Sequence, residues 1–135
     1  MTTTAEAAKA PAVAVTFKAE IEVSAQKVTD QIISAFEGGS NYWIDKVTAK
    51  KGRELATERP WYADPKVWSS DFLIEVLAEE DSRVHLLTPA KINEGFAYLS
   101  TKYPSRIAEI VEENGDAETG DVFLQACLFG DIVYG

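Results

Sequence analysis

The chain has 135 residues, of which 46% are hydrophobic, and it carries a formal net charge of −9 at pH 7. This length suits a single domain that buries about two-thirds of its unfolded surface. The excess of negative charge repels phosphate backbones and argues against direct binding to nucleic acid. Because Cys127 is the only cysteine and His85 the only histidine, an intramolecular disulfide and a structural zinc site are excluded.

Residues 1–12 are rich in Thr and Ala and have no basic stretch ahead of an apolar one. This composition indicates a flexible tail and not a secretion signal. No apolar run approaches the ~20 residues that span a bilayer, so no membrane contact is expected. We predict one α+β domain over residues 13–135, with a cytosolic location.

The strongest periodicity of two lies in residues 13–23, where apolar side chains alternate with polar ones. That pattern predicts a half-buried strand. Ser24 is a good helix N-cap, and helical spacing of apolar residues predicts a helix over 25–37 that ends at Gly38. The aromatic and β-branched run 41–48 predicts a second strand.

Residues 50–70 show no sustained period and contain Gly and Pro, so they predict a long loop. Residues 71–78 and 83–87, separated by a polar turn, predict a β-hairpin. Thr88-Pro89 and Pro104 then each begin a helix, the second ending at Asn114-Gly115.

A last helix begins near Asp116 or Thr119 and is apolar around nearly its whole circumference. Such a helix lies either in the core or in an interface between copies, so we also expect a homo-oligomer. The fold class is therefore α+β, a three- to four-stranded antiparallel sheet with an N-terminal crossover helix and three C-terminal helices.

Charge is unevenly distributed along the chain. Residues 44–68 hold six basic and four acidic residues, whereas residues 69–135 hold thirteen acidic and four basic ones. The second half therefore predicts an acidic surface.

Aromatic and basic residues gather between positions 41 and 68, a composition found in interfaces and nucleotide pockets as well as in cores. We take nine residues as candidates for binding a ligand or partner: Asn41, Tyr42, Trp43, Arg53, Arg59, Trp61, Tyr62, Trp68 and Arg106.

No catalytic residues, metal ligands or cofactors are predicted. Asp116, Glu118 and Asp121 could offer oxygen ligands, but the spacing fails for an EF-hand, and carboxylates at a helix start favour capping. Cys127 lies in the most apolar helix and is expected to be a buried hydrophobe, not a nucleophile. A structural role is expected for His85.

Two strings, AFEGGSNYW at 35–43 and TGDVFLQ at 119–125 with LFGDIVYG at 128–135, resemble a family of small, mostly uncharacterised proteins of bacteriophages and prophages. The resemblance implies a phage-related origin, hence a location in the host cell cytoplasm, and no catalytic residues. The first hypothesis is thus a non-enzymatic phage accessory protein whose acidic surface binds a host protein, such as a defence component. The alternative is a protein that binds or sequesters a small nucleotide signal through residues 41–68.

Overall fold

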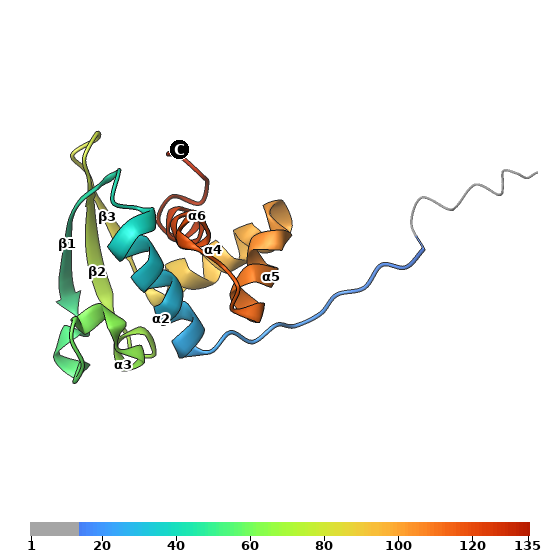
Figure 1. Ribbon diagram of the computed structural model, residues 1–135, viewed down its shortest axis with the longest axis horizontal. Coiled ribbons are helices and arrows are strands. Elements are labelled where there is room, and N and C mark those ends of the chain that lie inside the picture. Colours follow the sequence, from blue (N-terminus) through green and yellow to red (C-terminus); the bar gives the residue numbers. More distant parts are fainter. Residues whose placement is uncertain (1–13) are drawn as a thin grey trace, which may run out of the picture.

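The computed structural model describes residues 14–135 and shows an α+β fold, as predicted. A three-stranded antiparallel sheet lies on one side and most of the helices pack against one of its faces (Figure 1). The first half comprises helix α2 (Ala25–Ser34), the π-helical turn η1 (Ala35–Gly39), strand β1 (Ile44–Lys51), the 3₁₀ turns η2 (Arg53–Leu55) and η3 (Trp61–Ala63), and helix α3 (Pro65–Trp68). The second half comprises β2 (Leu73–Ala78), β3 (Val84–Leu87), α4 (Pro89–Lys102), α5 (Pro104–Glu112) and α6 (Ala117–Phe129).

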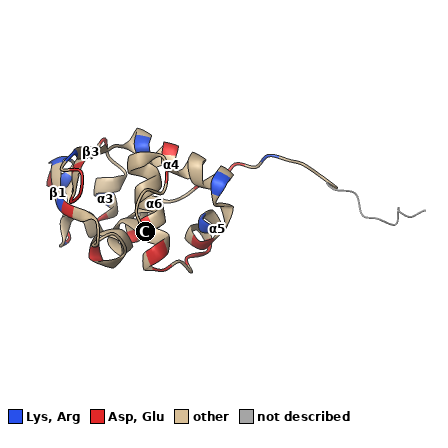
Figure 2. Cartoon of the chain, turned by 90° about the horizontal axis from the view of Figure 1, so that it is seen from above, with Lys and Arg blue, Asp and Glu red and all other residues tan. Residues whose placement is uncertain are grey.

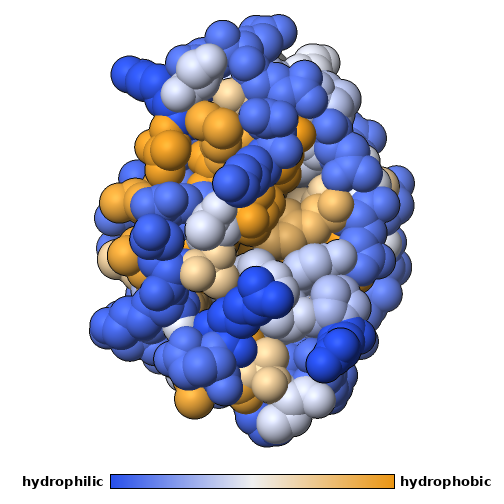
Figure 3. All heavy atoms as spheres, turned by 90° about the vertical axis from the view of Figure 1, so that its left-hand side faces the viewer, coloured by the Kyte–Doolittle hydropathy of each residue, from blue (hydrophilic) through white to orange (hydrophobic). Residues whose placement is uncertain are grey.

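The sheet has the order β1-β2-β3, and the predicted hairpin is formed by β2 and β3. The alternation of β2 places Ile74, Val76 and Ala78 in the core and leaves Leu73 and Leu77 on the opposite face. Figure 3 shows the side of the molecule that lies left in Figure 1, where apolar side chains form a band crossed by charged ones. No helix covers this outer face of the sheet in Figure 1.

Helix α6 lies in the centre of the domain and contacts α2, α4, α5, η1 and β3. Phe123 and Leu124 are fully buried, so the prediction of a core position is confirmed. Close approach depends on two glycines: a Cβ on Gly120 would lie 2.7 Å from Ser34 Cβ of α2, and one on Gly95 of α4 would meet the backbone of Cys127. Because one chain encloses α6, this helix no longer argues for an oligomer.

The strand predicted over residues 13–23 is wrong in the part that the structure describes. Residues 15–24 belong to no helix or strand, and Val15 and Phe17 are 75% and 80% exposed. Alternation alone does not form a strand, which also needs a neighbour to pair with. Helix α2 therefore precedes the sheet and does not cross between two strands. The tail predicted over residues 1–12 lies outside the described residues.

Other boundaries differ from the predictions for local reasons. Residues 41–43 form a turn, and the strand runs over Ile44–Lys51 instead of 41–48. Residues 50–70 contain η2, η3 and α3 where a long loop was predicted. Helix α5 ends at Glu113, which takes the left-handed conformation (φ 60°) in place of Asn114 or Gly115. The starts of α4 at Thr88 and of α6 at Asp116 are confirmed.

Candidate functional site

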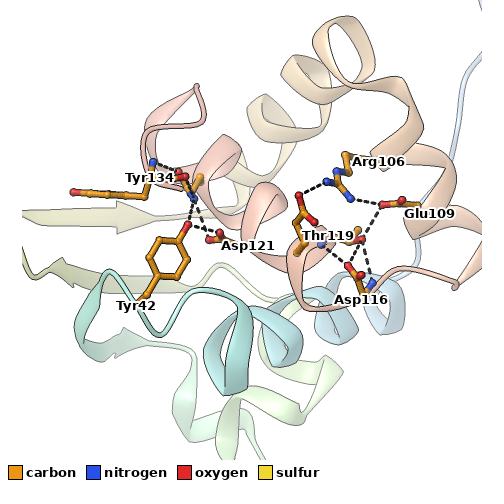
Figure 4. Close-up of polar contacts among 9 residues, drawn as sticks. Tyr42, Arg106, Glu109, Asp116, Thr119, Asp121 and Tyr134 are labelled. Carbon is orange, nitrogen blue, oxygen red and sulfur yellow. Dashed lines mark hydrogen bonds and ion pairs between the residues drawn. The ribbon is translucent and has the colours of Figure 1, made fainter.

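The two strings that carry the family resemblance meet at one buried carboxylate, that of Asp121 on α6 (Figure 4). Its Oδ1 accepts hydrogen bonds from Ser40 Oγ (2.8 Å), Trp43 Nε1 (2.8 Å) and Gln125 Nε2 (3.0 Å), and its Oδ2 accepts one from Tyr42 OH (2.7 Å). Ser40, Tyr42 and Trp43 come from the turn before β1. The turn is thus fastened to α6 by charge-assisted hydrogen bonds.

Gln125, one helical turn after Asp121, fastens the C-terminal tail to the same place. Its Oε1 accepts hydrogen bonds from the backbone N–H groups of Val133 (2.7 Å) and Tyr134 (2.8 Å). The Tyr134 ring then stacks on Trp43 with a centroid distance of 5.2 Å and an interplanar angle of 10°. Helix, turn and tail form one connected polar network.

This network joins the turn before β1, helix α6 and the C-terminal tail. Burial, together with the hydrogen bond to Asp121, raises the pKa of Tyr42 to about 12, so the phenol stays protonated at neutral pH. Trp43 is 1% exposed and belongs to the core. The other two candidates from this turn, Asn41 and Tyr42, are exposed to solvent.

Sequence reasoning did not find Asp121, Gln125, Ser40 and Tyr134 as a network. Its signal was present: Asp121 and Gln125 are two polar residues four apart in a helix that is otherwise almost wholly apolar. Polar side chains inside a core need hydrogen-bond partners, so this spacing predicts a buried network.

Arg106 of α5 pairs with one carboxylate of its own helix, Glu109, and with one at the start of α6, Glu118 (Figure 4). Its Nη1 lies 3.0 Å from Glu109 Oε1, and its Nη2 lies 2.8 Å from Glu118 Oε2. Thr119 Oγ1 donates to Glu109 (2.7 Å), and the Asp116 side chain accepts from Thr119 N (3.1 Å). These hydrogen bonds lower the pKa of Glu109 and of Asp116, so both stay ionised.

Four exposed carboxylates gather where α5 ends and α6 begins, and we call them the acidic corner: Glu112, Glu113, Asp116 and Glu118. Figure 2 shows acidic residues of α5, α6 and the turn between them on one side of the molecule, and both basic and acidic residues around β1 at the far end. On β1, Lys46, Lys50 and Lys51 are exposed. The turn between β2 and β3 also exposes Glu79, Glu80 and Asp81, so negative charge is not confined to the acidic corner.

The aromatic and basic residues of 53–68 form a second feature. Arg53, Arg59 and Trp61 line a groove of about 440 Å³ together with Pro60 and with Glu58. Neither guanidinium has an ion-pair partner within 4.0 Å in residues 14–135. Arg106 does not line this groove, so the structure does not bring it to the other candidates.

The remaining aromatic candidates, Trp68 and Tyr62, pack behind the groove and contact Trp61. Trp68 is buried and its Nε1 donates to Tyr62 O (2.8 Å), while Trp61 lies against Trp68 at 6.1 Å between ring centroids. Tyr62 donates its hydroxyl to Glu37 (2.8 Å). Trp68 and Tyr62 therefore position Trp61 without facing the groove themselves.

Buried Asp64 holds this segment in shape. It accepts hydrogen bonds from the backbone N–H groups of Lys66 (2.9 Å), Thr57 (2.8 Å) and Glu58 (3.2 Å). The bonds from Lys66 and Thr57 are the main reasons that the pKa of Asp64 is lowered to about 2. The groove is thus formed by ordered backbone.

Residues 14–135 were compared with the arrangements that metal binding and a reactive thiol require. No group of three or more His, Cys, Asp or Glu side chains is placed to hold a metal ion there. Burial raises the pKa of the Cys127 thiol. His85 contacts Asp81 (3.2 Å) and packs edge-on against Phe129, which confirms its structural role.

Comparison of the chain with protein-family models, curated proteins and solved structures found no match. Over residues 14–135, no helix combines the length and apolar character needed to cross a membrane.

Proposed function

We propose that the chain is a non-enzymatic binding protein whose acidic corner engages a positively charged protein. The resemblance of its two strings to phage and prophage proteins supports a partner from the host cell, such as a defence component. In this proposal the carboxylates lie against a basic surface of the partner. Their charge speeds the association of the two proteins and fixes the orientation in which they bind.

The observation that carries the proposal is the rigid arrangement of the acidic corner. Asp116 and Thr119 form a capping box, and two contacts join α5 to α6: Arg106 to Glu118 (2.8 Å) and Thr119 Oγ1 to Glu109 (2.7 Å). The turn between the helices is therefore fixed before a partner arrives. A preorganised surface loses less conformational entropy on binding than a mobile one.

A charge-reversal experiment tests the proposal. Glu112→Lys with Glu113→Lys changes the acidic corner, whereas Glu79→Lys with Glu80→Lys makes the same change in net charge at the exposed β2–β3 turn. The immobilised chain and both variants are exposed to bacterial host lysate, and captured proteins are identified by mass spectrometry over a salt series. A basic protein should be retained by the chain and by the β2–β3 variant and lost by the corner variant. Equal loss from both variants, or capture by all three, would contradict the proposal.

A second candidate function is binding of a small anionic aromatic molecule, such as a nucleotide signal, in the groove beside Trp61. The unpaired guanidinium groups of Arg53 and Arg59 favour it, since they would pair with phosphate while the indole stacks on a base. The carboxylate of Glu58 in the same lining opposes an anion, which is why we place this function second. Calorimetry with a set of nucleotides tests it: binding heat that disappears in Arg59→Ala would support it, and no heat with the unchanged chain would remove it.

A further inference from the structure

Residues 15–23 have the pattern of a strand but no partner in the isolated chain. Val15, Phe17 and Ile21 are 75%, 80% and 58% exposed, although these large apolar side chains alternate regularly with Thr16, Lys18, Glu20 and Glu22. A segment of this kind is stable when one face is covered and its backbone is paired.

Strand β1 offers an edge of matching length. It pairs with β2 on one side, and on the other side no strand pairs with it in the part of the chain that the structure describes. Its eight residues compare with nine in 15–23, whereas β3 at the opposite edge has four. In Figure 1, β1 is the outermost element on its side of the molecule. A long free edge is a site for strand addition.

An apolar notch lies beside this edge on the inner face of the sheet. It has a volume of about 200 Å³ and is lined by Ile44 and Val47 of β1 with Phe36, Trp61 and Tyr62. A strand added to β1 would direct every second side chain to this face. Val15 and Phe17, the most exposed side chains of the apolar side, therefore fit the notch, whereas Val23 beside the helix cap stays packed against its own core.

The polar sides of the two strands are also complementary. β1 exposes Lys46, and a register that places Glu20 or Glu22 opposite it forms one pair of opposite charges. Lys18 lies on the same side of the segment, and the two glutamates are two residues apart, so they do not both face Lys46 and Lys50. Opposite charges on facing strands stabilise a pair, whereas like charges at the same places would oppose it.

Residues 15–23 do not reach the β1 edge of their own chain. Figures 1 and 2 both show the segment leaving the domain on the side away from β1. Ser24 is fixed as the cap of α2, where its Oγ accepts from Lys27 N (3.2 Å), so no linker remains to cross the domain once 15–23 is extended.

We propose that residues 15–23 pair with β1 of a second copy of this chain and fill its apolar notch. The exchange is reciprocal, so each copy gives one strand and receives one, and the two-fold symmetric dimer is closed. This self-association uses the edge of the sheet and leaves the acidic corner free, and it goes beyond the function proposed above.

Light scattering on the full chain gives the first test. The expected mass is twice 14.8 kDa. Phe17→Asp should yield the 14.8 kDa monomer, because a charge would enter the notch; Phe17 is exposed, so the domain should stay folded. Val84→Asp is the matched control on the outer face of the sheet and should leave the dimer intact. A monomeric full chain, or a dimer lost in Val84→Asp and kept in Phe17→Asp, would overturn the proposal.

A charge exchange and a cross-link test the pairing itself. Glu20→Lys with Glu22→Lys should weaken the dimer by roughly tenfold, and adding Lys46→Glu should strengthen it again. A photoreactive benzoylphenylalanine at position 17, in a mixture of ¹⁴N and ¹⁵N chains, should give cross-links to β1 or η3 that join the two isotopes. Cross-links confined to single-isotope products would place the strand on its own chain and refute the exchange.

Discussion

Replacing Asp121 by Ala should destabilise the domain far more than removal of an exposed carboxylate. Three of its four donors belong to buried residues. Gln125 Nε2 keeps the carbonyl of Tyr134 as an acceptor (3.2 Å), whereas Ser40 Oγ and Trp43 Nε1 would lose theirs. A buried donor without a partner costs about 1–3 kcal/mol, so the two together cost roughly 4 kcal/mol. With a urea m value of about 2 kcal/mol/M, the midpoint should fall by about 2 M.

Asp121→Asn separates the shape of this site from its charge. An amide oxygen in the place of Oδ1 keeps the bonds from Ser40, Trp43 and Gln125, and the amide nitrogen faces Tyr42 OH, whose oxygen can accept. The loss should be about 1–2 kcal/mol, the difference between charged and neutral hydrogen bonds.

Urea unfolding followed by tryptophan fluorescence measures these changes, because Trp43 is buried in the network. Asp131→Ala is the control: this exposed carboxylate also accepts a tyrosine hydroxyl, from Tyr98 (2.8 Å), and its removal should cost no more than about 0.5 kcal/mol. The reasoning fails if Asp121→Ala costs less than about 1 kcal/mol, or if the Ala and Asn variants are equally unstable.

Four other outcomes follow from the same structure. Gln125→Met removes the acceptor for two tail amides, so hydrogen exchange at the C-terminal tail should accelerate while exchange in α4 stays unchanged. The pKa of Tyr42 is raised to about 12 in the folded state, so its contribution to stability is complete below the unfolded value of about 10 and is lost as pH rises through 12. In an absorbance titration, the Tyr42→Phe variant should lack one of the phenol groups that ionise at high pH in the unchanged chain. The pKa of Asp64 is lowered to about 2, so its contribution is present above about pH 4 and is lost as pH falls through 2; Asp64→Asn should flatten the loss of melting temperature over that range. Gly95→Ala places a Cβ 2.9 Å from Cys127 Cα and should cost about 1–3 kcal/mol in chemical unfolding, whereas Gly38→Ala, with nothing within 4 Å of its new Cβ, should cost less.

Elements with local signals could be predicted from the sequence. Thr88-Pro89 and Asp116 mark helix starts through their own side chains, and the structure has α4 and α6 begin there. The hairpin of β2 and β3 follows from alternation on both sides of a polar turn. In each case the deciding interactions lie within a few residues.

Features that depend on distant contacts could not be predicted in this way. Residues 15–23 alternate as regularly as any strand, yet pairing depends on an edge elsewhere, which periodicity does not specify. Tyr42 and Trp43 have strand-like composition, but their bonds to Asp121, about eighty residues later, hold them in a turn. The site candidates Arg59 and Arg106 are both basic. The packing of α5 on α6 pairs Arg106 with Glu118, in addition to its pair with Glu109 inside α5.

The central position of α6 has a consequence for synthesis. The ribosome makes this helix after every other helix and strand that it contacts: α2, η1, β3, α4 and α5. Until α6 emerges, the apolar faces of those elements remain open to water and to other nascent chains. A chain interrupted before Ala117 would lack the centre of its core, so premature termination should produce an insoluble fragment and not a smaller folded unit.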